Sequence, residues 1–153
     1  MKISLIFTFI TLMTLTEVTF ARIPVCYNNK DKVLIDNHQA LSLRDFMENG
    51  FKTRALLEGT LVSVLENKQG HTHLEIDLDN DSQTLDDRIE VIYNNEYGDL
   101  PDLKKGDRLI ACGDFILDAY SPYKAIIHWL HKSLNVKKHN DGFLVINNIV
   151  FGS

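Results

Sequence analysis

Histidine and tryptophan side chains gather in one short segment of this chain. Residues 128–143 hold His128, His131 and His139 together with Trp129, the only tryptophan in the sequence. Histidine changes between neutral and charged forms near neutral pH and is the commonest metal ligand. The segment therefore indicates acid–base chemistry, metal binding or ligand recognition. A structural role is the other interpretation, in which the imidazoles hydrogen-bond loop carbonyls and hold the last two strands together.

The spacing of the histidines limits how they can meet. Side chains alternate between the two faces of a strand, so His128 and His131 point oppositely while both remain in regular β-structure. They converge only if the strand ends or bulges near Leu130. His71 and His73 are two residues apart and share a face. One of them could approach the later group from a neighbouring strand.

A zinc site would need three or four ligands from this set. The candidates are His73, His128, His131 and His139, with Asp141 as a carboxylate option. Their spacings are not diagnostic of a metal, so no cofactor is established, and zinc or another divalent metal is an alternative. A metal-assisted hydrolase or phosphodiesterase is the matching enzyme alternative. The chain has neither a Gly-x-Ser-x-Gly nucleophile motif nor a phosphate-binding glycine loop.

The first 21 residues have the layout of a secretory signal peptide. Met1 and Lys2 give a positive start, residues 3–16 are apolar, serine or threonine, and Ala21 ends a stretch with small residues. This pattern predicts removal of residues 1–21 and a periplasmic or secreted protein. The apolar run is shorter than the ~20 residues of a membrane span, so no stable span is expected after processing. An uncleaved anchor helix is the alternative.

The charge of the remaining chain restricts its partners. Residues 22–153 suit one domain, and their net charge stays at −5 because the leader carries one basic and one acidic side chain. Non-specific affinity for nucleic acids comes from Lys and Arg that neutralise phosphates, so an acidic domain is a poor general binder of them. Lys132, Lys137 and Lys138 could still form a local basic patch.

The two cysteines allow one disulfide. Cys26 and Cys112 both follow the predicted leader, and an oxidising compartment would permit them to pair. In the alternative, Cys112 is buried in a strand and Cys26 stays unpaired in a loose N-terminal arm.

Hydrophobic periodicity predicts a mainly β domain with one N-terminal helix. The helix is expected over residues 37–51, with Asn37 as its N-cap. Strands are expected at residues 55–66, 71–79, 88–94, 108–117, 124–131 and 142–151. Five or six strands at this spacing favour a small OB-like β-barrel over residues 55–153, after an arm and helix over residues 22–54. Gly59 is expected to allow the first strand to bend, and five aspartates between residues 77 and 87 to form a solvated hairpin tip.

Several landmarks, in order, resemble a family of small secreted bacterial proteins known as domain of unknown function 3465. They are Gly59-Thr60-Leu61-Val62, Gly70 with His73, Tyr93-Asn94, Gly106-Asp107, His128-Trp129 with His131, and His139 with Asp141-Gly142-Phe143. The resemblance covers residues 57–143. It implies an OB-like barrel, export and no established activity.

The chain departs from the family pattern at several positions. Tyr93 stands where a histidine is expected, and Lys132 replaces one of two adjacent histidines. Leu74, Leu130 and Ser133-Leu134 also differ. If the family's histidines form a functional cluster, this chain has lost part of it.

These observations lead to one functional hypothesis, an exported OB-like domain that binds a ligand or partner through its His/Trp end. OB barrels hold oligonucleotides or oligosaccharides on one strand face and its loops, and an envelope protein is the other partner considered. The ligand-binding candidates are His73, Tyr93, Asn94, His128, Trp129, His131, His139 and Asp141.

Overall fold

The computed structural model describes residues 22–79, 81, 83–135 and 137–153. The predicted signal peptide, residues 1–21, lies outside the described residues. Among the described helices, none has the length and apolar character needed to cross a membrane.

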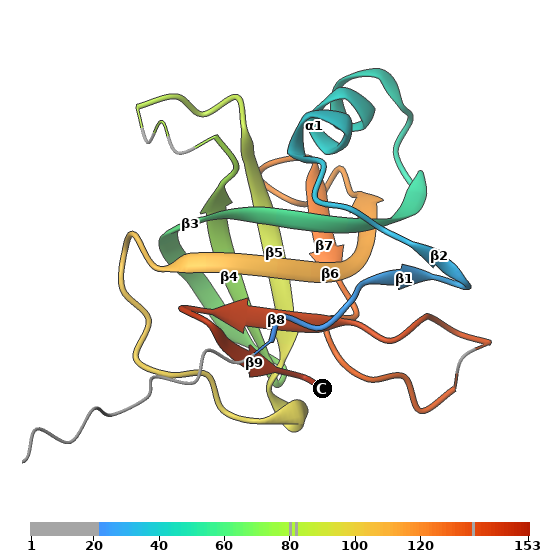
Figure 1. Cartoon of the computed structure of the whole chain (residues 1–153). Coiled ribbons are helices and arrows are strands. Elements are labelled where there is room, and N and C mark those ends of the chain that lie inside the picture. Colours follow the sequence, from blue (N-terminus) through green and yellow to red (C-terminus); the bar gives the residue numbers. More distant parts are fainter. Residues whose placement is uncertain (1–21, 80, 82, 136) are drawn as a thin grey trace, which may run out of the picture.

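The described chain is mainly β with one α-helix (Figure 1), which confirms the predicted class. A small hairpin, β1 (Tyr27–Asn28) and β2 (Asp31–Lys32), precedes the helix α1 (Asn37–Phe46). The strands and the 3₁₀ helix η1 then follow in the order β3 (Lys52–Lys68), β4 (His71–Asp77), β5 (Arg88–Asn94), η1 (Asn95–Tyr97), β6 (Arg108–Leu117), β7 (Ala125–His128), β8 (Phe143–Ile146) and β9 (Ile149–Phe151).

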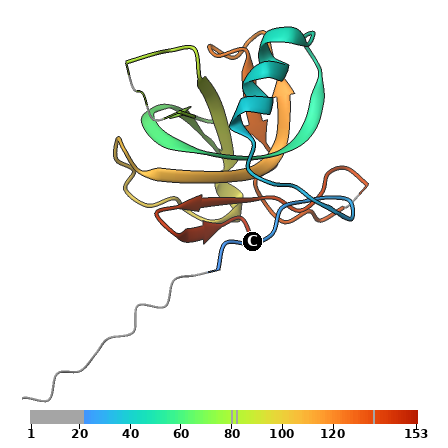
Figure 2. The ribbon, with the colours of Figure 1, turned by 45° about the horizontal axis from the view of Figure 1, so that its top comes forward.

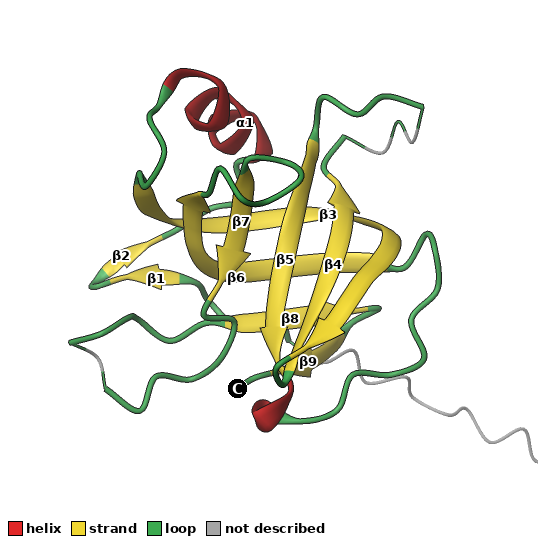
Figure 3. Cartoon of the chain, turned by 180° about the vertical axis from the view of Figure 1, so that it is seen from behind, coloured by secondary structure: helices red, strands yellow, loops and turns green. Residues whose placement is uncertain are grey.

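Strands β3 to β9 form one seven-stranded sheet with the order β3-β4-β5-β7-β6-β8-β9, and β3 pairs with β6 as well. The pairing of β5 with β7 is parallel, and the others are antiparallel. The pairings of β3, β4, β5, β7 and β6 therefore run in a circuit that returns to β3. From behind, β5, β4 and β7 cross in front of β3 and β6 (Figure 3).

The long strand β3 makes this circuit possible because it serves two neighbours. Its residues 52–60 pair with β6, and residues 60–68 pair with β4, so the strand curves round the sheet (Figure 2). Gly59 lies at the change of partner, where an added Cβ would stand 2.3 Å from the carbonyl oxygen of Asp77. Close backbone approach thus requires glycine at this position.

Alternation along β4 and β5 separates the core from the candidate site. Leu74 and Ile76 of β4 join Ile89 and Val91 of β5 in the main hydrophobic core. The alternate residues, among them His71 and His73, lie on the opposite face. The helix adds Ala40 to the core. The sheet therefore presents the two histidines of β4 on the side away from the apolar interior.

The helix differs from its predicted limits at both ends. It ends at Phe46 rather than residue 51, and its N-cap is Asp36, whose carboxylate accepts a hydrogen bond from the Gln39 backbone N–H at 2.8 Å. The Asn37 side chain instead donates to the carbonyls of Glu58 and Leu78. The Asn37 side chain therefore attaches the start of the helix to the sheet instead of capping the helix.

The last two predicted strands are also divided differently. β7 ends at His128, because Trp129 adopts a positive φ of 60° that regular strand geometry excludes. Residues 142–151 form two strands joined by Asn147-Asn148, both with positive φ. That conformation is typical of a tight hairpin turn.

A disulfide joins Cys26 to Cys112, with a Cα–Cα distance of 5.7 Å. It ties the β1–β2 hairpin to β6 and lies in a second, smaller apolar cluster with Ile110, Phe143 and Val145. The N-terminal arm is thereby fixed against the sheet.

Replacing both cysteines by serine should lower the free energy of unfolding by about 3–5 kcal/mol, because the bond closes a long loop in the unfolded chain. The two cysteines are 86 positions apart. Urea unfolding of the oxidised protein and of Cys26→Ser/Cys112→Ser measures the difference, and reduced wild type should behave as the double variant does. Equal midpoints for oxidised protein and variant would contradict the expectation.

Candidate functional site

Six aromatic or imidazole rings from separate parts of the chain form one contact network, here named the ring cluster. Its members are His71, Tyr97, His128, Trp129, His131 and His139. Trp129 is the centre of the network, since His128 and His139 stack on it with ring centroids at 4.6 and 4.8 Å. Tyr97 stacks on His131 at 3.7 Å. The predicted His128–Phe143 segment therefore does gather its histidines.

The end of β7 explains how His128 and His131 meet. Strand alternation would have placed them on opposite faces, but the positive φ of Trp129 turns the chain directly after His128. His131 then reaches Trp129 edge-on, with a centroid distance of 5.9 Å. The sequence predicted that His128 and His131 could converge only if the strand ended or bulged near Leu130, and the strand does end there.

Three glycines hold the backbone of residues 128–131 in place. An added Cβ on Gly113, Gly142 or Gly152 would stand 2.3, 2.0 or 2.1 Å from a carbonyl oxygen of this segment. Gly142 also donates its N–H to the carbonyl of His131 at 2.8 Å. The segment is thus packed against neighbouring backbone on several sides.

Hydrogen bonds to loop carbonyls orient three of the imidazoles. The Nδ1 atoms of His71, His131 and His139 lie 2.8–3.0 Å from backbone carbonyl oxygens one or two residues away. A carbonyl only accepts, so each Nδ1 donates and the Nε2 of the neutral ring is left as an acceptor. These contacts support the structural interpretation of the histidine segment.

Burial disfavours the charged forms of His128 and His131. It lowers the pKa of His128 to about 4, and the neighbouring His71, His131 and His73 add to the effect against the opposing charge of Asp114. Burial also lowers the pKa of His131. His128 and His131 are therefore neutral at neutral pH.

His73 lies on the same face of β4 as His71, but its imidazole contacts a carboxylate rather than another ring. Its Nδ1 is 2.6 Å from a carboxylate oxygen of Glu90 on β5, and Glu90 is largely buried. This pair occupies one imidazole nitrogen of His73. The predicted candidate is therefore near the ring cluster but engaged with a carboxylate.

A second network fills the far end of the β4–β5 face. Arg88 is buried and contacts Glu75 at 2.8 Å and Asp77 at 3.5 Å. The Ser63 hydroxyl donates to Glu75 at 2.7 Å. Burial and a hydrogen bond to Glu75 raise the pKa of Tyr123 to about 12. These groups satisfy one another rather than offering an open site.

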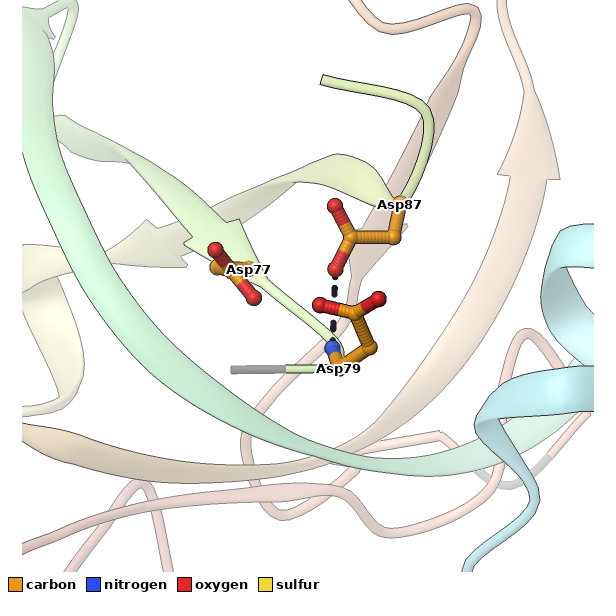
Figure 4. Close-up of side chains that lie close together, drawn as sticks. All are labelled: Asp77, Asp79 and Asp87. Carbon is orange, nitrogen blue, oxygen red and sulfur yellow. Dashed lines mark hydrogen bonds between the residues drawn. The ribbon is translucent and has the colours of Figure 1, made fainter. Parts of the chain in front are cut away.

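Three aspartates approach one another where β4 leads toward β5 (Figure 4). Ligand atoms of Asp77, Asp79 and Asp87 lie within 4.8 Å of one another. Asp77 and Asp87 are buried, so the expected solvated hairpin tip is wrong for them. Asp87 accepts the backbone N–H groups of Leu78 and Asp79, and the Arg88 guanidinium lies 3.5 Å from Asp77 and 3.9 Å from Asp87.

The zinc alternative finds no support in the histidine geometry. Within the described part of the chain, that aspartate trio alone brings three potential metal ligands within 4.8 Å. The predicted ligands His128, His131 and His139 pack as rings around Trp129, and His73 binds Glu90.

The remaining candidates support the cluster rather than extend it. Tyr93 is fully buried, so it cannot contact a ligand, and its hydroxyl donates to the carbonyl of Tyr97 at 2.9 Å. Asn94 caps η1, and the Asp141 carboxylate accepts the backbone N–H of Ser133 at 2.8 Å. The expectation that His71 or His73 could approach the later group is confirmed for His71, whose ring lies 5.6 Å from that of His128. His71 was nevertheless absent from the candidate ligands, and sequence reasoning missed Tyr97.

Two hollows border the segment that carries the ring cluster. The basic hollow, of about 370 Å³, is lined among others by Lys52, Arg54, Asp114, Lys137, Lys138 and His139. The apolar-walled hollow, of about 490 Å³, is lined among others by Pro24, Val25, Tyr27, Asp141, Phe143 and Ser153. Asn29 and Asn140 line both. The disulfide-tied arm therefore forms a wall of each hollow.

No family model and no curated protein matches this chain. The resemblance to domain of unknown function 3465 stays a prediction from the sequence.

Stability should fall as the pH is lowered from about 6.5 to about 4. In this window the unfolded chain protonates His128 at its ordinary pKa, while the folded protein resists protonation until about pH 4. The unfolded state thus binds more protons, and the loss reaches at most about 3 kcal/mol. Urea unfolding measures the free energy of unfolding at each pH. This free energy should fall less steeply with decreasing pH for His128→Gln than for wild type.

His38→Gln is the matched control, since it removes the histidine of α1, which lies outside the ring cluster. It should keep the wild-type slope. Identical slopes for wild type and His128→Gln would refute a depressed pKa at His128.

Gly142→Ala should destabilise the fold by about 1–3 kcal/mol, because its methyl group has no space beside the Trp129 carbonyl. Since Trp129 is the only tryptophan, its emission should also shift to the red as water reaches the indole. Unchanged emission and unchanged unfolding midpoint would show that the segment yields without strain.

Proposed function

We propose that this chain is an exported ligand-binding domain, built as an OB-like barrel, that binds its ligand at the ring cluster. The observation that carries the proposal is the ring cluster itself. Four of the six histidines join the only tryptophan and a tyrosine, and one of them, His139, also lines the basic hollow.

The strand pairings support the OB-like assignment. An OB fold is a five-stranded, partly open Greek-key barrel. The circuit of β3, β4, β5, β7 and β6 has five strands, and its parallel contact joins β5 to β7. By this assignment, β4 and β5 are the second and third barrel strands, whose face and adjoining loops hold ligands in OB folds. His71 begins β4, and Tyr97 ends η1 directly after β5.

The leader and the disulfide support export. Residues 1–21 follow the signal-peptide pattern, and a disulfide between Cys26 and Cys112 suits an oxidising compartment. We therefore assign the mature chain to the periplasm or the extracellular medium.

Binding is favoured over metal-assisted hydrolysis by the state of the rings. His128 and His139 provide flat ring surfaces where they stack on Trp129, and the Nδ1 bond of His139 leaves its Nε2 atom for a ligand. Such groups suit recognition of sugar hydroxyls or of nucleobases. Their nitrogens do not converge on one point as a preformed zinc site requires.

The fluorescence of Trp129 tests the proposal directly. Three probes cover the ligand classes: a neutral chitin oligosaccharide, a sulfated heparin oligosaccharide, and oligothymidylate of about eight nucleotides, within the usual OB site size. At least one should change Trp129 emission in a saturable way. His139→Ala, which removes one stacked ring, should weaken that binding about tenfold, while His38→Ala should leave it unchanged.

No response from any probe at millimolar concentration would contradict binding at the ring cluster. Stoichiometric zinc in native mass spectra, lost in His128→Ala, would instead favour the hydrolase alternative.

A further inference from the structure

The basic hollow carries a charge opposite to that of the whole chain. Lys52, Arg54, Lys137 and Lys138 line it together with a single carboxylate, Asp114. These side chains sum to +3, whereas the chain as a whole has a net charge of −5. A local positive potential in an acidic protein attracts anions to one place.

The carboxylate of Asp114 is already matched within the hollow. It contacts Lys52 at 2.6 Å and Arg54 at 3.1 Å. Arg54 is held further by donating to the carbonyl of Asp141, and its side chain is only 2% exposed. The buried pair of Arg54 and Asp114 thus forms a fixed base, over which the exposed lysines are free to adjust to a ligand.

The uncharged lining also suits an oxyanion. Asn28, Asn29 and Asn140 carry amide donors, and Thr53 carries a hydroxyl. Phosphate and sulfate oxygens accept several hydrogen bonds at once, and bonds from charged donors are the strongest. A neutral sugar in the same place would leave the positive charge uncompensated.

His139 connects this hollow to the ring cluster. It lines the hollow and stacks on Trp129 with a centroid distance of 4.8 Å. A ligand at the ring cluster can therefore extend a charged group into the hollow.

We propose that the basic hollow binds a phosphate or sulfate group of the ligand, with Lys137 and Lys138 as its principal contacts. This inference rests on the proposed function and specifies it, because it selects anionic ligands over neutral ones. Phosphate would come from a nucleotide chain and sulfate from a modified glycan.

The test compares two pairs of lysines that are adjacent in the sequence, one pair inside the hollow and one outside it. Lys137→Gln/Lys138→Gln removes charge from the hollow, and Lys104→Gln/Lys105→Gln removes the same charge from the turn before β6, outside the hollow. Titration with inorganic phosphate and with sulfate, followed by amide NMR shifts at His139 and Asn140, should show binding to wild type and the control. The hollow variant should bind about tenfold more weakly.

The two polymeric probes then distinguish the sources. Oligothymidylate or the heparin oligosaccharide should bind with an affinity that falls with salt, and the hollow variant should show a smaller salt dependence. Whichever polymer binds more tightly through these lysines identifies the source of the anion.

Equal phosphate binding by the two lysine variants would overturn the inference. If the chitin oligosaccharide changes Trp129 emission while both lysine variants bind all anions alike, the proposed function stands and the inference fails. If phosphate binding depends on Lys137 and Lys138 but no oligomer affects Trp129, the inference stands and the proposed function fails.

Discussion

The parallel pairing of β5 with β7 is the contact on which the rest of the structure depends. It consists of two register pairs, Glu90 with Ile126 and Val91 with Ile127. The β3–β6 pairing already joins the β3–β4–β5 meander to the β6–β7 pair, and the β5–β7 contact closes the circuit of strands. Without it, the end of β7 would not lie beside the start of β4. His128 would then not contact His71, and the His128 imidazole would lose the burial that lowers its pKa.

Anchoring and the proposed recognition meet in one side chain of the ring cluster, His139. Its Nδ1 bond to the carbonyl of Asn140 fixes the imidazole, and this half-buried ring keeps its other nitrogen and part of its surface for contact. Preorganised groups lose little conformational entropy when a ligand binds. His131 is buried, so its bond to the carbonyl of Lys132 serves anchoring alone.

The sequence was sufficient for much of the fold because hydrophobic alternation is a local signal. β5 and β6 have the bounds that the pattern predicts. The end of β7 was not predictable, since a positive φ is unfavourable for a bulky residue such as Trp129. Glycines far apart in the sequence, Gly113, Gly142 and Gly152, surround that turn, and a local pattern contains no information about them.

The site was predictable in its main segment and unpredictable in its neighbours. His128, Trp129, His131 and His139 are close in sequence, so their composition alone marked them. The basic hollow depends on tertiary contacts, because β3, β6 and the N-terminal arm supply parts of its lining. Tyr97 likewise joins the ring cluster only through its tertiary contact with His131. The buried Asp77 and Asp87 depend on Arg88 in the same way.

The wall of the apolar-walled hollow has a practical consequence for work with this protein. Pro24 and Val25, near one end of the described chain, and Ser153, at the other, line the same hollow. An affinity tag or fluorophore attached at Ser153 would lie at the rim of this hollow and would compete with a ligand there. Tyr120, 96% exposed between β6 and β7, lines neither hollow and is the better place for surface attachment.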